Sequence, residues 1–332
     1  MMPPPAWTIL GQGLAGTCLA WQLLERNVPF TIIDRGIGGS SRVAAGLVNP
    51  VTGRQFEPSW RIAEFLPESV AFYRDIEQIL GTSLWHPLPV LRLAQTGDEW
   101  RKIRHKAEQP EVARWIDEAL ADPPGGWTGA IVLGGGGRLD TRAFLDRSRA
   151  HFESLGLYRQ DEISPDDTNR ELVRCDGAAG LLSGQLGAHR CAKGEILTLR
   201  ATGWDESMIR VGAGGWLVPI GNGCFKAGST YEWQTLDESP TAEGRAKVAT
   251  IATRLGGADF EILAHEAGVR PIVRRSQPLI GPLPEGCWIF NGLGSKGSLY
   301  APGVARRLAD WLVDGIEADP SLDLRNFRMI AS

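Results

Sequence analysis

The sequence predicts an α/β protein: a Rossmann-like nucleotide-binding domain into which an α+β domain with an antiparallel sheet is inserted. Two strand–glycine loop–helix patterns support the first domain, one beginning at Trp7 and the other at Trp288, near opposite ends of the chain. Between them, short apolar runs around Asn222-Gly223 are typical of a β-hairpin. The 332 residues also exceed one typical domain of about 150 residues, so we expect two domains.

The first expected strand, residues 7–10, leads directly into the motif Gly11-Gln12-Gly13-Leu14-Ala15-Gly16. Gly11 allows a tight turn, Gly13 lets a pyrophosphate approach the backbone, and Gly16 lets the following helix pack closely on the sheet. A second strand, residues 30–33, ends at Asp34, whose carboxylate is placed to accept hydrogen bonds from a ribose. The spacing therefore predicts an adenine-dinucleotide site, and both NAD and FAD fit it.

The loop that follows, residues 36–50, is rich in glycine, serine and alanine. Such density predicts a backbone that passes close to a flat or phosphorylated ligand, with a solvent-exposed loop as the alternative. Apolar residues at helical spacing then predict a core helix over residues 60–80.

The pattern of apolar and charged residues changes over residues 84–137. Short apolar runs surround a charged stretch near residues 97–121, which we expect to be helical. Asp140 is placed as the N-cap of a helix that ends at Gly156. Two strands around Asn222-Gly223 form the expected hairpin, and a helix is predicted from about Pro240 to Leu255.

The last pattern is a strand, residues 288–290, that leads into a glycine loop over residues 291–298. The final helix is expected after Pro302. We expect both ends of the chain to build one cofactor domain, from residues 1–83, 138–192 and 266–332. The substrate domain would take residues 84–137 and 193–265.

Composition excludes several classes of protein. Hydrophobic residues make up 43% and charged residues 22%, as in ordinary globular proteins, and the net charge of −4 argues against a protein that mainly coats nucleic acid. No apolar run approaches the ~20 residues of a membrane span, and no secretory signal is visible, so we expect a cytoplasmic protein without a membrane partner. Five scattered cysteines without a C-x-x-C pair predict neither a disulfide framework nor a metal site.

The order of these motifs resembles the FAD-dependent D-amino-acid oxidase superfamily, and more closely its glycine oxidase and sarcosine oxidase branch. Four stretches carry the resemblance: residues 11–16 with Asp34, residues 40–47, residues 268–281, and residues 291–297. The last stretch is also similar to the oxidase half of the bifunctional enzyme that modifies wobble uridine in tRNA. The family resemblance implies a glutathione-reductase-type cofactor domain.

The resemblance implies FAD as the cofactor and assigns candidate site residues by position. Arg270 would clamp the carboxylate of the substrate, because a guanidinium fork binds a carboxylate through two hydrogen bonds; a surface arginine is the alternative. Tyr231 would be a substrate-contacting aromatic. Lys296 would face the flavin, with a solvated or phosphate-facing lysine as the alternative. The residues expected at the cofactor are Gly11, Gly13, Leu14, Ala15, Gly16, Asp34, Arg35, Ser40, Ser41, Ala45, Gly46, Val173, Gly177, Gly292, Gly294, Ser295, Lys296 and Gly297.

The function that this resemblance implies is oxidation of a C–N bond in a small amine or amino acid of the glycine, sarcosine or D-amino-acid type. Hydride would pass to flavin N5, with O₂ as acceptor. One alternative is oxidation of a carboxymethylaminomethyl group on tRNA, for which the basic run over residues 101–106 is the sequence feature; a solvated helix face explains the same run. Another is a flavoprotein subunit without turnover of its own. The sequence leaves the oligomeric state open.

Overall fold

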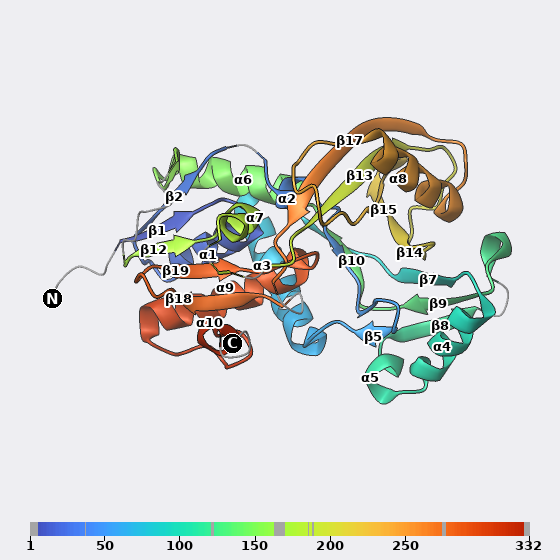
Figure 1. The fold of residues 1–332 in the computed structure, drawn as a ribbon, viewed down its shortest axis with the longest axis horizontal. Helices are drawn as coiled ribbons and strands as arrows, with labels where there is room; N and C mark the ends of the chain where they lie inside the picture. Colours follow the sequence, from blue (N-terminus) through green and yellow to red (C-terminus); the bar gives the residue numbers. More distant parts are fainter. Residues whose placement is uncertain are drawn as a thin grey trace.

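The computed structural model describes residues 6–36, 38–120, 123–162, 170–184, 186–187, 189–273 and 277–328. Two large sheets, one of six strands and one of eight, lie side by side along the long axis of the molecule (Figure 1). The six-stranded sheet lies at the left of that view with its helices, and the eight-stranded sheet lies at the right.

The six-stranded sheet joins segments from both ends of the chain, as the two glycine-loop patterns predict. Its order is β11-β2-β1-β12-β19-β18, and all pairs are parallel except β18 with β19. β12 lies between β1 and β19, so the first and last strand–loop–helix units share one sheet. The strands are β1 (Trp7–Leu10), β2 (Phe30–Asp34), β11 (Tyr158–Gln160), β12 (Leu172–Arg174), β18 (Leu279–Pro282) and β19 (Trp288–Asn291).

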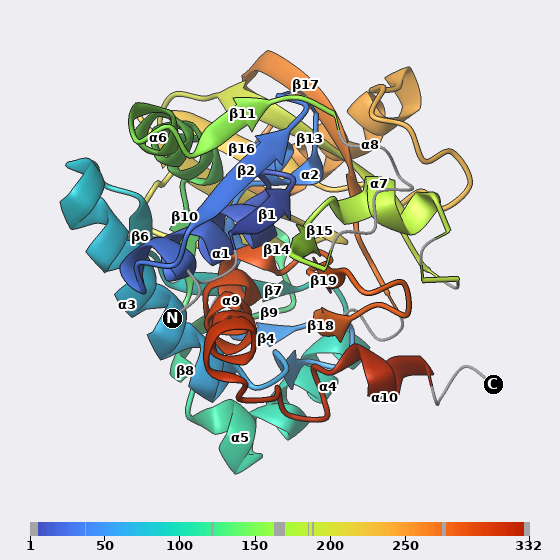
Figure 2. The same cartoon turned by 90° about the vertical axis from the view of Figure 1, so that its left-hand side faces the viewer.

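Helices cover this sheet and build the largest core. α1 packs against α9 and is buried over almost its whole length (Figure 2). The aromatic rings of Tyr73, Phe144 and Tyr300 are fully buried in this core. The helices around this core are α1 (Leu14–Glu25), α3 (Ile62–Leu80), α6 (Thr141–Ser154) and α9 (Gly297–Asp314); shorter ones are α2 (Ser40–Val43), α7 (Gly177–Leu182) and α10 (Leu324–Arg328).

The eight-stranded sheet has the order β17-β13-β16-β15-β14-β7-β9-β8. α8 (Ala242–Leu255) packs on one face, and the other face packs against Val51, Phe56, Ile103 and Val112. The predicted hairpin is confirmed, because Asn222 and Gly223 both have positive φ, of 56° and 70°, between β15 and β16. The strands are β7 (Val90–Ala94), β8 (Ile116–Leu120), β9 (Gly129–Leu133), β13 (Ala192–Arg200), β14 (Ile209–Gly212), β15 (Gly215–Gly221), β16 (Cys224–Gly228) and β17 (Glu261–Arg270).

Short strands connect the two sheets. β3 (Leu47–Val48), β10 (Gly137–Leu139) and β6 (Trp85–Pro87) form a three-stranded sheet, and β4 (Val51–Thr52) pairs with β5 (Glu57–Pro58). β17 crosses residue 266, where the sequence places a domain boundary. The division into two domains therefore stays a prediction.

Two expected elements differ in the structure. The stretch near 97–121 is helical only in α4 (Gly97–Ala107) and α5 (Pro110–Ala113), and its last part is β8, because pairing with β9 overrides the helical preference of Glu118 and Ala119. The helix expected after Pro302 begins earlier, at Gly297.

The early start of α9 is possible because a side chain replaces the missing proline donor. In a regular helix the N–H of residue 302 would bond to the carbonyl oxygen of Ser298, and proline has no N–H. The hydroxyl of Tyr73 donates to that oxygen at 3.0 Å instead. The expected N-cap of α6 is confirmed, since the Asp140 carboxylate accepts from the N–H of Ala143 at 3.0 Å.

Within the described residues, no helix is long and apolar enough to cross a membrane. The same residues contain no group of three or more histidine, cysteine, aspartate or glutamate side chains arranged to hold a metal ion.

Candidate functional site

A large cavity of about 1070 Å³ lies between the two sheets. Ligand pockets commonly measure about 300–1000 Å³, so this one has room for a dinucleotide together with a small substrate. One end is lined by the glycine motif and the carboxyl ends of β1, β2 and β12. The other end is lined by side chains of the eight-stranded sheet.

Glycines shape the cofactor end by leaving no room for side chains. A Cβ at Gly11, where φ is +101°, would lie 2.7 Å from the carbonyl oxygen of Cys175. A Cβ at Gly16 would lie 1.9 Å from the carbonyl oxygen of Gly11, so α1 can approach the turn only without one. The first-turn N–H groups of α1 have no partners within the helix, and Leu14 and Ala15 line the cavity there. Such a helix N-terminus suits the diphosphate of a dinucleotide.

Asp34 is held at the end of β2 by three donors. Its carboxylate accepts from the backbone N–H of Gln12 at 2.8 Å and from that of Gly36 at 2.7 Å. Arg149 on α6 lies 3.3 Å from it and is itself fixed by the Gln12 side chain at 2.8 Å. The orientation leaves the carboxylate lining the cavity, where a ribose hydroxyl can donate to its remaining lone pairs.

Sequence reasoning missed Arg149 and the role of Gln12. Arg149 comes from α6, far along the chain, and no motif surrounds it. Its position is set by the packing of α6 against α1, and Trp21 on α1 donates to Ser148 beside it at 2.9 Å.

Arg270 is buried at the end of the cavity that the eight-stranded sheet lines, with 8% of its surface exposed. Its Nη2 donates to Ser229 Oγ at 2.6 Å and to the Thr230 carbonyl at 3.2 Å. Its Nη1 is buried without a hydrogen-bond partner, and no carboxylate in the described part of the chain pairs with the guanidinium. Burial lowers the pKa of Arg270. The surface-arginine interpretation is therefore wrong.

Tyr231 stands next to Arg270 at the edge of the cavity. The guanidinium lies 4.2 Å from the centre of its ring, within the range of a cation–π contact. The ring is 48% exposed and stacks on Trp233 with centroids 5.9 Å apart. Tyr231 thus covers one side of the Arg270 head group while remaining open to solvent.

Lys296 is a second, half-buried cation that lines the cavity. Its Nζ donates to Thr52 Oγ1 at 2.9 Å and to Ser59 Oγ at 3.1 Å. Burial lowers the pKa of Lys296 to about 8. Two hydroxyl groups thus hold the ammonium group, and its protonation changes close to neutral pH. Its orientation toward the flavin stays a prediction.

The cavity gathers most of the residues that the sequence predicts. Fifteen of the eighteen expected cofactor residues line it, together with Arg270 and Tyr231. Three expected cofactor residues do not line the cavity: Gly16, Val173 and Gly292. Gly16 is a packing glycine; Val173 is buried in the sheet between Ile9 and Trp288. Gly292 packs against the backbone of Gln277, where a Cβ would lie 2.9 Å from the carbonyl oxygen.

Several known proteins are similar to this sequence over nearly its whole length. The family model DAO, described as FAD dependent oxidoreductase, matches residues 6–311. Glycine oxidases of Pseudomonas aeruginosa and Pseudomonas putida are 27% and 31% identical, over 93% and 95% of this chain and 94% and 95% of theirs. The tRNA 5-methylaminomethyl-2-thiouridine biosynthesis bifunctional protein MnmC of Marinobacter nauticus is 24% identical over 91% of this chain, which spans 54% of that protein.

A solved structure shows the same fold. The iminodiacetate oxidase of Chelativorans sp. BNC1 superposes with a TM-score of 0.77 at 22% identity, over 95% of this chain and 96% of that one. The glycine turn, the helix N-terminus and Asp34 fit the diphosphate and ribose of FAD. The family match and the 31% identity show that this chain belongs to the DAO family of FAD-dependent oxidoreductases.

Proposed function

We propose that this enzyme oxidises the C–N bond of a small amino acid or N-substituted amino acid whose carboxylate binds Arg270. The observation that carries the proposal is the buried guanidinium with a free Nη1 beside the cavity. A buried cation without an acidic partner is costly, and a substrate carboxylate supplies the missing charge. Glycine, sarcosine and small D-amino acids are the candidate substrates, in line with the glycine oxidases among its relatives.

The residues of the chain position the substrate. Arg270 binds the carboxylate through its free Nη1, because Nη2 already donates to Ser229 and to the Thr230 carbonyl, and the Tyr231 ring contacts the guanidinium. This fixes the carbon next to the amine against the cofactor and limits its rotation. FAD, when bound, supplies the acceptor for the hydride that leaves this carbon. The amine nitrogen loses a proton, and the imine that leaves is hydrolysed to a carbonyl compound and an amine.

Lys296 has an electrostatic role in this proposal. Below a pH of about 8 its ammonium group is positive, and Thr52 and Ser59 keep it in place. A fixed positive charge beside the cofactor favours the developing negative charge when dioxygen, the acceptor in this proposal, takes the electrons and is released as hydrogen peroxide.

An anaerobic titration of the purified holoenzyme tests the proposal. Glycine, sarcosine, D-alanine and D-proline are added separately while the visible flavin bands are recorded. Bleaching by at least one of them is the expected result. Flavin bands that none of them bleaches would contradict oxidation of small amino acids and would favour a large substrate or a subunit without turnover.

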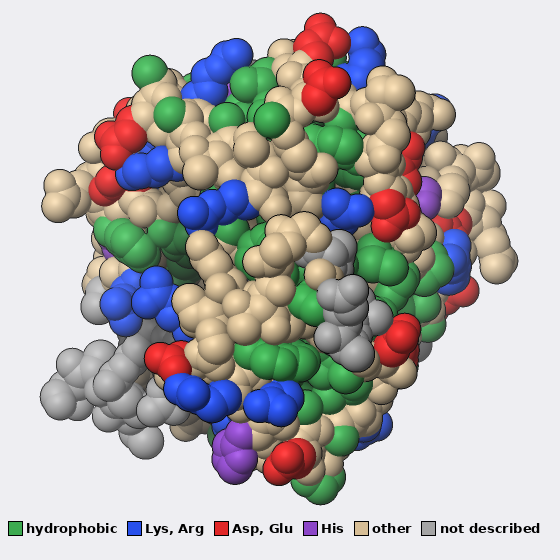
Figure 3. Space-filling view, turned by 90° about the vertical axis from the view of Figure 1, so that its right-hand side faces the viewer, with side chains coloured by type: hydrophobic (Ala, Val, Ile, Leu, Met, Phe, Trp, Pro, Cys, Tyr) green, Lys and Arg blue, Asp and Glu red, His purple; other side chains and the backbone are tan. Residues whose placement is uncertain are grey.

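A second candidate is oxidation of an aminomethyl group on tRNA, which the similarity to MnmC favours. The basic run lies on α4, but Arg101 pairs with Asp98 and Lys106 pairs with Glu57. The face that carries α4 shows basic side chains mixed with acidic and apolar ones (Figure 3). Binding of unmodified tRNA that weakens with salt would support this candidate, and no binding at low salt would exclude it.

A further inference from the structure

The eight-stranded sheet carries a second arginine, Arg92, into the same cavity, several strands across the sheet from Arg270. Arg92 on β7 is paired in register with Val211 on β14, and Val211 with Trp216 on β15. Residues directly opposite one another across strands share one face of a sheet. Arg92, Val211 and Trp216 all line the cavity, so this row forms its floor.

The row of paired residues Arg92, Val211 and Trp216 continues across the sheet toward Arg270. Trp216 is paired with Gly228, and a Cβ at Gly228 would lie 2.6 Å from the indole ring. The indole therefore covers the glycine, and the next residue, Ser229, accepts the hydrogen bond from Arg270. An apolar floor of Val211 and Trp216 thus separates two guanidinium groups.

Arg92 is only partly neutralised. Its Nη2 donates to Glu99 at 2.6 Å, which fixes the direction of the side chain. Its Nε is buried without a partner among the described residues. Burial lowers the pKa of Arg92, and Glu99 opposes this effect, so the group stays charged.

The acidic side chains that line the cavity lie away from Arg92. Among the described residues they are Asp34, Glu162, Asp176 and Glu238. Asp34 ends β2 and Asp176 follows β12, both in the six-stranded sheet, and Glu238 accepts from the N–H of Gly39 at 3.0 Å. The wall that Leu47, Val51 and Gly53 contribute adds apolar side chains and backbone and no charge.

We propose that Arg92 is a second anion-binding subsite, which selects amino-acid substrates whose other substituent crosses Trp216 and ends in an acidic group. This rests on the proposed function, because Arg270 must hold the first carboxylate. Three strand spacings of about 4.8 Å separate Gly228 from Arg92, about 14 Å in all. With both arginine side chains reaching inward, the substrate is an extended dianion and not a compact one.

Binding of dicarboxylic acids to the holoenzyme tests this without turnover. Dicarboxylates from succinate to dodecanedioate, and the monocarboxylates of matching chain length, are titrated while the flavin absorption bands are followed. At one chain length the dicarboxylate is expected to bind at least tenfold more tightly than its monocarboxylate partner. Arg92→Met is expected to remove this preference while leaving monocarboxylate binding within twofold.

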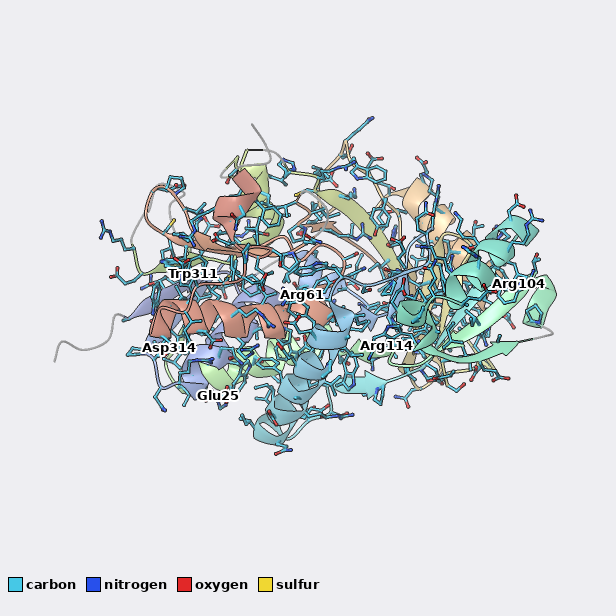
Figure 4. The ribbon with its side chains drawn as sticks, turned by 90° about the horizontal axis from the view of Figure 1, so that it is seen from below. Glu25, Arg61, Arg104, Arg114, Trp311 and Asp314 are labelled. Carbon is cyan, nitrogen blue, oxygen red and sulfur yellow. The ribbon has the colours of Figure 1, made fainter. Side chains whose placement is uncertain are left out.

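Three further variants keep the test decisive. Arg92→Lys retains the charge and guards against misfolding of the methionine variant; it is expected to keep part of the preference. Glu99→Gln removes the competing carboxylate and is expected to strengthen dicarboxylate binding. Arg104→Gln removes an equal charge from α4, on the outside of the molecule (Figure 4), and is expected to change nothing.

The outcomes separate the two proposals. Monocarboxylate binding that needs Arg270, with no gain for any dicarboxylate, would overturn the Arg92 subsite and leave the proposed function standing. A dicarboxylate preference that Arg92→Met and Arg104→Gln reduce equally would also overturn it, since a general loss of positive charge would then be the cause. No binding of any carboxylate would contradict the role of Arg270, and with it both proposals.

Discussion

The two ends of the cavity differ in the chemical groups that line them: backbone at one end and charged side chains at the other. The cofactor end is made of backbone: glycines that exclude side chains and a helix N-terminus. The other end, where we propose that the substrate binds, holds the buried cation Arg270, with no acid paired to it in the described part of the chain. The first end is specific for the shape and charge that many dinucleotides share, whereas the second can distinguish one small anion from another. Cofactor class and substrate choice are therefore separable in this enzyme.

The largest effect is expected from removing the carboxylate clamp. Arg270→Leu leaves the cofactor end untouched, so FAD content is expected to remain normal. The ratio kcat/KM for the best small amino acid is expected to fall roughly a hundredfold to a thousandfold, because a buried charge pair is lost. Steady-state peroxide production measures this. A fall below threefold with normal flavin content would contradict the clamp.

Backbone geometry at the cofactor end is tested by two glycines of similar conformation. Gly46 and Gly53 have φ of +69° and +76°, but a Cβ at Gly46 would lie 1.8 Å from the Leu139 carbonyl oxygen, whereas Gly53 has open space. Gly46→Ala is expected to cost more than about 3 kcal/mol of unfolding free energy, and Gly53→Ala about 1 kcal/mol. Denaturant unfolding of both variants gives the comparison. Equal losses would show that strain alone, and not close packing, requires the glycine.

Lys296 lines the same cavity and predicts a pH dependence. Its pKa of about 8 means that the ammonium group loses its proton as the pH rises through that value. Reoxidation of the reduced enzyme by O₂ is expected to slow above this pH. Lys296→Met is expected to slow reoxidation about a hundredfold at neutral pH, more than it slows reduction, and to remove the pH dependence. Stopped-flow measurements would contradict this if parent and variant reoxidise equally fast.

The smallest effect is expected at Asp34. Asp34→Asn keeps the size of the side chain but replaces one of the oxygens that accept from Gln12, Gly36 and Arg149. FAD affinity is expected to fall about tenfold with little change in kcat of the reconstituted enzyme. Fluorescence titration of the apoprotein with FAD measures the affinity. An unchanged affinity would remove Asp34 from the cofactor site.

The sequence predicts residues that belong to one local motif better than residues that packing or strand pairing brings in from a distance, for a physical reason. A backbone cradle needs glycine at fixed spacing, so Gly11 and Gly16 are visible in the chain order. Arg92, by contrast, reaches the cavity through the pairing of β7 with β14, which no local pattern encodes. Arg149 is likewise positioned by helix packing. The strand β8 was expected to be helical because its composition favours a helix and only its pairing with β9 decides otherwise.

The central claim is that Arg270, a buried arginine without an acidic partner among the described residues, binds the carboxylate of the substrate. Flavin reduction by glycine and sarcosine, compared with glycinamide and dimethylamine, tests it in the parent and in Arg270→Leu. The parent is expected to reduce at least a hundredfold faster with the carboxylates, and the variant is expected to lose most of this preference. Equal rates for the carboxylates and for their analogues without a carboxylate in the parent would contradict the claim.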